Sequence, residues 1–224
     1  MMANACLFSG GKDSTLALHK ARASGIKIDL LLTMLPENKA SYMFHYPNLR
    51  FAEMQAEAMG ISHRFFNTEG KKEEELKDLE KALMENGVDL LVTGATYSRY
   101  QFERIGAIAK RLGIENLAPL WHIDPLLELN ELSRDFNAIV TSVSAEGFDD
   151  SFLGARIDQG MINKLILLNQ KYNINMLFEG GEAESFVLDA PLFKKKIKVS
   201  KARKDWNGSR GTYTIEEAEL AKKG

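Results

Sequence analysis

The first half of the chain alternates short apolar runs with longer amphipathic stretches. The runs have the length of buried strands, and the stretches between them carry apolar residues at helical spacing. This pattern predicts strands over residues 5–8, 28–33, 63–67 and 89–93, and helices over 15–23, from Pro47 to just before Gly60, over 71–86 and over 98–112. Strands that alternate with helices form βαβ units, so the expected fold class is α/β, with a doubly wound parallel sheet.

The alternation of strands and helices stops beyond Pro119. Asp124 followed by Pro125 is typical of a helix N-cap with proline at the first helical position. The elements expected from there on are a helix to about Phe136, a strand over 137–144, a helix over 159–171, and strands over 194–203 and 212–215 joined at the turn signal Asn207-Gly208. We therefore predict an α/β domain over residues 1–130 and a smaller α+β region over 131–224.

The composition is that of an ordinary globular protein, and it narrows the classes of function. Of 224 residues 45% are hydrophobic, and 31 acidic residues nearly balance 29 basic ones, for a net charge of -2. That balance argues against a protein held to nucleic acid mainly by phosphate neutralisation. Cys6 is the single cysteine and the four histidines lack metal-binding spacing, so neither a disulfide nor a metal site is predicted. Since no apolar run approaches the ~18 residues of a membrane span, we expect a cytoplasmic protein.

The strongest local motif is Ser9-Gly10-Gly11-Lys12-Asp13-Ser14, between the first predicted strand and the first helix. Adjacent glycines let a backbone approach a phosphate closely, and the amides at a helix N-terminus favour an anion. Two serine hydroxyls and the Lys12 ammonium add further donors. The motif is not a Walker A loop, because that pattern requires glycine where Cys6 stands, and it lacks the GxGxxG pattern of dinucleotide-binding folds. We interpret it as a phosphate-binding loop.

Two further segments lie where strands are expected to end. The segment from Gly94 to Arg104 follows the fourth predicted strand and enters a helix, on which Tyr100 and Arg104 share a face. A solvated helix with ordinary ion pairs would explain the same residues. The loop 41–45, Ser-Tyr-Met-Phe-His, follows the second predicted strand, and its aromatic residues are compatible either with a nucleotide contact or with packing on the core.

The segment from Glu179 to Asp189 is acidic and contains a Gly-Gly pair. Three carboxylates, those of Glu179, Glu182 and Glu184, fall within six residues. Like charges at this spacing repel one another unless a cation or a proton lies among them. A solvated acidic turn is the alternative, but the apolar residues 186–188 that follow directly favour a half-buried functional site.

The loop hexapeptide resembles that of the PP-loop, or N-type, ATP pyrophosphatases, which cleave ATP between its α- and β-phosphates. With the segments at 41–45, 94–104, 119–121 and 179–193, the chain resembles the diphthine–ammonia ligase (diphthamide synthetase) family in its shorter, archaeal-type form. The resemblance implies that ATP and ammonium are used to amidate the carboxylate of diphthine, a modified histidine on elongation factor 2. It further implies an acyl-adenylate, release of AMP and pyrophosphate, Mg²⁺ bound through the ATP phosphates, a substrate-binding role for residues 131–224, and compatibility with a homodimer.

The resemblance also implies roles for individual residues. It assigns ATP binding to Ser9, Gly10, Gly11, Lys12, Asp13, Ser14, Met34, Tyr42, Met43, His45 and Gly94. It assigns substrate binding to Tyr97, Tyr100, Gln101 and Arg104. The expected catalytic residues are Lys12, Glu179, Glu182 and Glu184, and our hypothesis is that the three carboxylates attract ammonium and accept its proton.

Two other functions compete with this one. A PP-loop enzyme that modifies transfer RNA is weakened by the single cysteine and by the lack of an evident basic RNA-binding arm. A module that binds ATP without turning it over leaves the acidic segment without a purpose. The basic stretch 194–204 is interpreted as a solvated edge strand protected from aggregation, with contact to an acidic partner or to RNA as the alternative. Membrane association and direct nucleic-acid binding are not expected.

Overall fold

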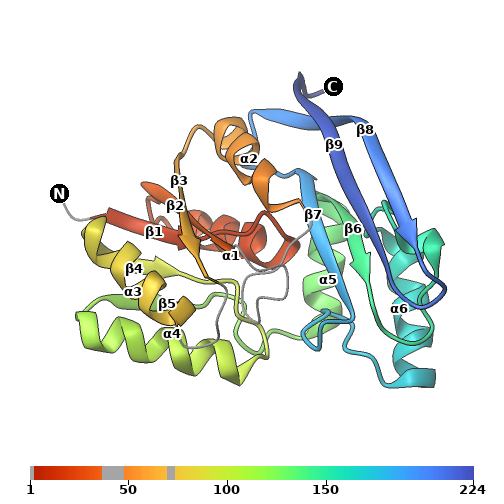
Figure 1. Ribbon diagram of the computed structural model, residues 1–224, viewed down its shortest axis with the longest axis horizontal. Helices are drawn as coiled ribbons and strands as arrows, with labels where there is room; N and C mark the ends of the chain where they lie inside the picture. The colour runs from red at the N-terminus through yellow and green to blue at the C-terminus, as the bar shows by residue number, and fades with distance from the viewer. Residues whose placement is uncertain (1–2, 37–47, 70–73) are drawn as a thin grey trace. The chain divides into compact units, whose positions relative to one another are not determined.

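A five-stranded parallel sheet organises the first part of the computed structural model, which describes residues 3–36, 48–69 and 74–224 (Figure 1). The strands are Ala3–Leu7 (β1), Leu30–Pro36 (β2), Ser62–Thr68 (β3), Val88–Val92 (β4) and Glu115–Leu117 (β5). They lie in the order β3-β2-β1-β4-β5, so the direction of winding reverses between β1 and β4. This order confirms the predicted doubly wound α/β class, in which ligands bind at the carboxyl ends of the strands beside the reversal.

The helices between these strands follow the predicted order. They are α1 (Lys12–Ala23), the 3-10 turn η1 (Leu49–Phe51) with α2 (Ala52–Met59), α3 (Glu74–Glu85) and α4 (Arg99–Leu112). Two of them end where the sequence placed a glycine, since Gly60 and Gly113 adopt φ values of 70° and 68° after α2 and α4. Ser98, where the predicted helix begins, is the N-cap residue of α4, and its side chain accepts a hydrogen bond from the amide of Gln101.

Strand β2 is buried on both of its faces. Leu30, Leu32 and Met34 belong to a buried cluster with side chains from α3 and α4, namely Leu79, Ala82, Leu83, Ile105 and Ile108. Leu31 and Thr33 alternate with them along the strand and are fully buried as well. A strand with two buried faces is what a parallel sheet covered by helices on both sides requires.

A second, antiparallel sheet occupies the C-terminal part of the chain. Its strands are Asn137–Val143 (β6), Ala183–Asp189 (β7), Lys195–Trp206 (β8) and Gly211–Lys222 (β9), in the order β7-β6-β9-β8. The accompanying helices are α5 (Pro125–Asp135), α6 (Gln159–Tyr172) and the 3-10 turn η2 (Asp150–Phe152). The predicted smaller α+β region is therefore confirmed.

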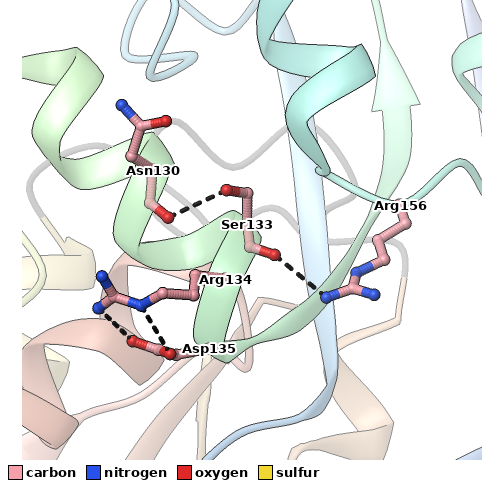
Figure 2. A network of polar contacts seen from close by, with 5 residues as sticks. All are labelled: Asn130, Ser133, Arg134, Asp135 and Arg156. Atoms are coloured by element: carbon pink, nitrogen blue, oxygen red, sulfur yellow. Dashed lines mark hydrogen bonds and ion pairs between the residues drawn. The ribbon is translucent and has the colours of Figure 1, made fainter.

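Helix α5 is closed at both ends by side chains. At its start the Asp124 carboxylate accepts hydrogen bonds from the amides of Leu126 and Leu127, as the N-cap pattern predicted. At its end the Arg156 guanidinium donates to the carbonyls of Ser133 (3.1 Å) and Phe136 (3.0 Å), and Figure 2 shows it reaching the last turn of the helix. A cation on these carbonyls also opposes the negative end of the helix dipole.

The basic stretch of the sequence lies on β8, at the edge of the second sheet. Lys198 pairs with Glu219 at 3.1 Å and Lys201 with Glu216 at 3.0 Å, both across to the neighbouring strand β9. These carboxylates balance part of the positive charge of β8 within the hairpin itself. Charged side chains along an edge strand oppose pairing with another chain.

The chain divides into two compact units. The first contains the described residues of Met1–Ser9 and Asp13–His122, and the second contains Gly10–Lys12 and Ile123–Gly224. The division falls between His122 and Ile123, whereas residue 130, the boundary expected from the sequence, lies within α5. Within the described parts of the chain, no helix has the length and hydropathy needed to cross a membrane.

Candidate functional site

The phosphate-loop motif forms the turn between β1 and α1, as predicted. Within the first unit the amide of Ser9 donates to Ser14 Oγ at 3.3 Å, and the two hydroxyl oxygens lie 3.1 Å apart. Helix α1 begins at Lys12, so Asp13 and Ser14 belong to its first turn. The positive end of the helix dipole therefore lies within the motif, which suits an anion such as a phosphate.

Gly94, to which the resemblance assigned ATP binding, packs directly on the helical end of the loop. A Cβ built on Gly94 would lie 2.7 Å from the backbone nitrogen of Ser14 and 2.8 Å from the carbonyl carbon of Asp13. Both neighbours are main-chain atoms and cannot rotate away. Glycine is thus required at the carboxyl end of β4 because the start of α1 passes so close to it.

Lys12 is a buried side chain of the motif with defined contacts. It is 1% exposed, and its Nζ donates to the carbonyl oxygen of Leu177 at 2.7 Å within the second unit. The same Nζ lies 5.3 Å from the centre of the Phe178 ring, a cation–π distance. The backbone amide of Lys12 donates to Ser185 Oγ at 3.0 Å, and the carbonyl of Gly10 accepts from the amide of Val187 at 3.0 Å. Within the second unit, residues 10–12 are therefore bonded to β7 through their main chain and to the turn before β7 through the Lys12 side chain.

The sequence alone identified none of these four residues as a partner of the loop. Ser185 stands inside the acidic segment, but nothing in the pattern distinguished its hydroxyl from that of any other serine. Leu177 contributes only a backbone carbonyl, so its side chain carries no signal of the contact. The contact between Ser185 and Lys12 could be found only by predicting that β7 lies against residues 10–12, which is a tertiary contact.

The three predicted carboxylates occupy different positions. Glu182 is half-buried and accepts backbone hydrogen bonds on both oxygens, from Asn175 (Oε1, 2.8 Å) and from Gly180 (Oε2, 2.8 Å). Glu184 lies on β7 opposite Ser142 of β6 and is half-buried, as is Glu179 in the preceding turn. Ala183 and Ser185 alternate with Glu182 and Glu184 and are buried, as an extended segment requires.

The remaining predicted residues lie in the first unit or outside the described residues. Met34 is buried near the end of β2, and Tyr97 lies beside the His122 ring, with ring centres 5.1 Å apart. Tyr100 packs against the buried cluster, and the Arg104 guanidinium lies 4.3 Å above its ring, so these two residues do share a face of α4. Gln101 is half-buried in the first turn of that helix. The predicted nucleotide contacts Tyr42, Met43 and His45 fall outside the described residues.

Hydrogen bonds from β2 and β3 support Phe8, the residue that leads from β1 into the loop. The Thr33 hydroxyl donates to the carbonyl of Phe8 at 2.6 Å and lies 2.7 Å from His63 Nε2. Because a hydroxyl has a single proton, Thr33 must accept from His63, which therefore carries its proton on Nε2. Burial lowers the pKa of His63 from 6.5 to about 4, so the imidazole is neutral at neutral pH.

This lowered pKa predicts that acid weakens the fold. The unfolded chain binds a proton at its ordinary His63 pKa near 6.5, whereas the folded chain resists it down to about 4. The free energy of unfolding should therefore fall as the pH is lowered through this window and level off below it. Urea unfolding of the parent protein and of a His63→Gln variant, from pH 7.5 to pH 4, isolates the effect, because glutamine keeps an N–H donor but does not titrate. A parent-minus-variant difference that is constant with pH would contradict the assignment.

The described residues hold no group of three or more histidine, cysteine, aspartate or glutamate side chains that could bind a metal ion. A divalent cation that enters with a nucleotide needs few protein ligands, because phosphate oxygens and water supply most of its coordination. The anion-binding features of residues 9–14 are compatible with such a nucleotide.

Comparison with known proteins identifies relatives for both halves of the chain. The model of the diphthamide synthase N-terminal domain matches residues 2–116, and that of the diphthamide synthase C-terminal domain matches residues 124–221. The diphthine–ammonia ligase of Homo sapiens is 37% identical, over 87% of this chain and 82% of its own length. That of Schizosaccharomyces pombe is 33% identical over 85% of this chain but only 35% of its own length.

A similar solved structure is the "predicted subunit of tRNA methyltransferase" from Methanocaldococcus jannaschii. It matches with a TM-score of 0.45 and 16% sequence identity, over 85% of this chain and 98% of the other.

Proposed function

Since this chain belongs to the diphthamide synthase family, we propose that it uses ATP and ammonium to amidate diphthine on elongation factor 2. The family resemblance inferred from the sequence motifs is confirmed, and with it the ligase class. The observation that carries the proposal is Lys12. A buried ammonium at the start of α1, within a phosphate-loop motif, is fixed in place by Leu177 and Phe178.

The chemistry explains why ATP is needed. A carboxylate is a poor electrophile, so it is first converted into a mixed anhydride. A carboxylate oxygen of diphthine attacks the α-phosphorus, the bond to the bridging oxygen of the β-phosphate breaks, and pyrophosphate leaves. Ammonia then attacks the acyl carbon, AMP leaves with the electron pair of the broken C–O bond, and the amide remains.

The loop serves the first of these two steps. Negative charge grows on the departing pyrophosphate, and the N-terminus of α1 together with the Lys12 ammonium stabilises it. These groups are held in position before ATP arrives, so little reorganisation accompanies the reaction. Mg²⁺, bound through the phosphate oxygens, would supply further positive charge.

The acidic segment serves the second step. Ammonium is a cation and must lose a proton before its nitrogen can attack, so negatively charged groups both attract it and accept the proton. The resemblance assigns this role to Glu179, Glu182 and Glu184. Both carboxylate oxygens of Glu182 accept backbone amides of its own turn.

Analysis of the nucleotide product tests the function directly. The protein is incubated with ATP, Mg²⁺ and ammonium, with and without elongation factor 2 that carries diphthine. We expect AMP only when the factor is present, together with a decrease of about 1 Da in its mass as acid becomes amide. Omitting ammonium should abolish the mass change.

Each other outcome contradicts part of the proposal. AMP without amidation would mean that the protein adenylates a different acceptor. ADP, or no turnover with the diphthine-bearing factor, would rule out an AMP-forming ligase reaction on this substrate.

A further inference from the structure

The turn between α6 and β7 is organised by side chains that bind its backbone. The carboxylate of Glu182 accepts the amides of Asn175 and Gly180, each at 2.8 Å. The side-chain oxygen of Asn175 in turn accepts the amide of Leu177 at 2.8 Å. One carboxylate thus ties the beginning of the turn to its end, and it does so with charge-assisted bonds, which are stronger than neutral ones.

The fit around this carboxylate is close. A Cβ built on Gly180 would lie 2.7 Å from Glu182 Oε1, so any side chain there would push the carboxylate out of position. Phe178, in the middle of the turn, has a φ of 69°, which is unfavourable for a residue other than glycine. The turn holds that conformation because its amides are bonded, and the carboxylate of Glu182 supplies two of those bonds.

The turn in this conformation holds the Lys12 ammonium in a defined position. Leu177 points its carbonyl at Nζ (2.7 Å), and Phe178 places its ring 5.3 Å from the same atom. A lysine side chain is flexible, and fixing it before the reaction removes an entropic cost from the catalytic step. An ammonium has three donors, so a carbonyl contact fixes its position without removing its charge.

We propose that Glu182 is a positioning residue for Lys12 rather than the base that deprotonates ammonium. It shapes the turn whose Leu177 carbonyl and Phe178 ring hold the Lys12 ammonium where ATP phosphates bind. This inference rests on the proposed function, because it takes ATP to be the ligand of Lys12. The two roles predict different effects of replacing Glu182. Loss of a base would impair the use of ammonium, whereas loss of a residue that positions Lys12 would weaken the binding of ATP.

The Glu182→Gln variant tests this role. Glutamine keeps one acceptor but turns an N–H group toward a backbone N–H, so one amide loses its partner. We expect the dissociation constant for ATP with Mg²⁺, measured by titration calorimetry, to rise about tenfold, the effect of one lost hydrogen bond. The KM for ammonium should stay within about twofold of the parent value. Asp124→Asn is the matched control, because the Asp124 carboxylate also accepts local backbone amides, those of Leu126 and Leu127, but lies at the start of α5 rather than in the turn before β7.

Two further variants extend the test, and the first of them keeps it decisive if Glu182→Gln folds poorly. Gly180→Ala leaves the carboxylate in the chain but displaces it, and it should weaken ATP binding to a similar extent. In a Lys12→Met background, Glu182→Gln should change ATP affinity by less than twofold, because the contact through which it acts is already gone.

The outcomes separate this inference from the proposed function. Unchanged ATP affinity in Glu182→Gln with a raised KM for ammonium would overturn the positioning role. Equal effects of Glu182→Gln with and without Lys12 would overturn it as well. Failure of the parent protein to bind ATP or to form AMP would instead overturn the proposed function.

Discussion

Replacing Lys12 by methionine is expected to lower the rate of AMP formation by about 10²- to 10³-fold. Removal of one preorganised donor from a site where charge develops has an effect of this size. Methionine is of similar length and apolar, so it can occupy the same buried position while the positive charge is lost. Single-turnover assays with elongation factor 2 that carries diphthine measure the rate, and calorimetric titration with ATP measures binding separately.

The control must separate the role of Lys12 within the motif from the general effect of removing a lysine ammonium from a phenylalanine ring. Lys164 also places its ammonium over a phenylalanine ring, that of Phe152 at 5.4 Å, but it is exposed and lies on α6, outside the motif. Lys164→Met should leave AMP formation within about twofold of the parent rate. The Lys12 variant should also melt at a lower temperature, because the carbonyl of Leu177 loses its partner in a buried place. A Lys12→Met protein that is folded and fully active would exclude Lys12 from the reaction.

Local patterns in the sequence predicted most of the fold. Strands such as β1 and helices such as α4 have a periodicity, an N-cap or a terminal glycine that is complete within a dozen residues. Strand β5 was missed because its three residues, Glu115–Leu117, contain a single apolar side chain and form no run. Its place in the sheet comes from pairing with β4, which is a tertiary contact that local pattern does not encode.

The site was less predictable for the same reason. The motif around Lys12 is contiguous and could be recognised, but the bond from Lys12 to Leu177 spans 165 positions and ends on a main-chain oxygen. The acidic segment showed the opposite problem. Its charges suggested a cation among them, whereas the carboxylate of Glu182 is engaged by the backbone amides of its own turn. A run of carboxylates therefore indicates that hydrogen-bond donors lie nearby, but it does not tell whether the donor is an ammonium ion or a backbone N–H group.

Gly94→Ala is expected to impair both folding and activity, although it adds a single methyl group. The new Cβ would lie 2.7 Å from Ser14 N and 2.8 Å from Asp13 C, so the first turn of α1 must move. Such overpacking typically costs about 1–3 kcal/mol of stability, measurable by urea unfolding. Displacement of the loop by even ~1 Å can lower the rate about 100-fold.

A matched substitution in the neighbouring helix distinguishes this close contact from a general intolerance of alanine. Gly106 lies in the interior of α4, where a Cβ would meet nothing nearer than the Asn116 side chain at 3.9 Å. Gly106→Ala should therefore raise the free energy of unfolding by about 0.5–1 kcal/mol, through helix propensity, and leave AMP formation unchanged. If Gly94→Ala were as stable and as active as Gly106→Ala, the Cβ position of residue 94 could not lie as close as 2.7 Å to Ser14 N. A loss of stability in Gly94→Ala and a gain of stability in Gly106→Ala, measured in the same protein, would establish that residue 94 must lack a side chain for the first turn of α1 to lie where it does.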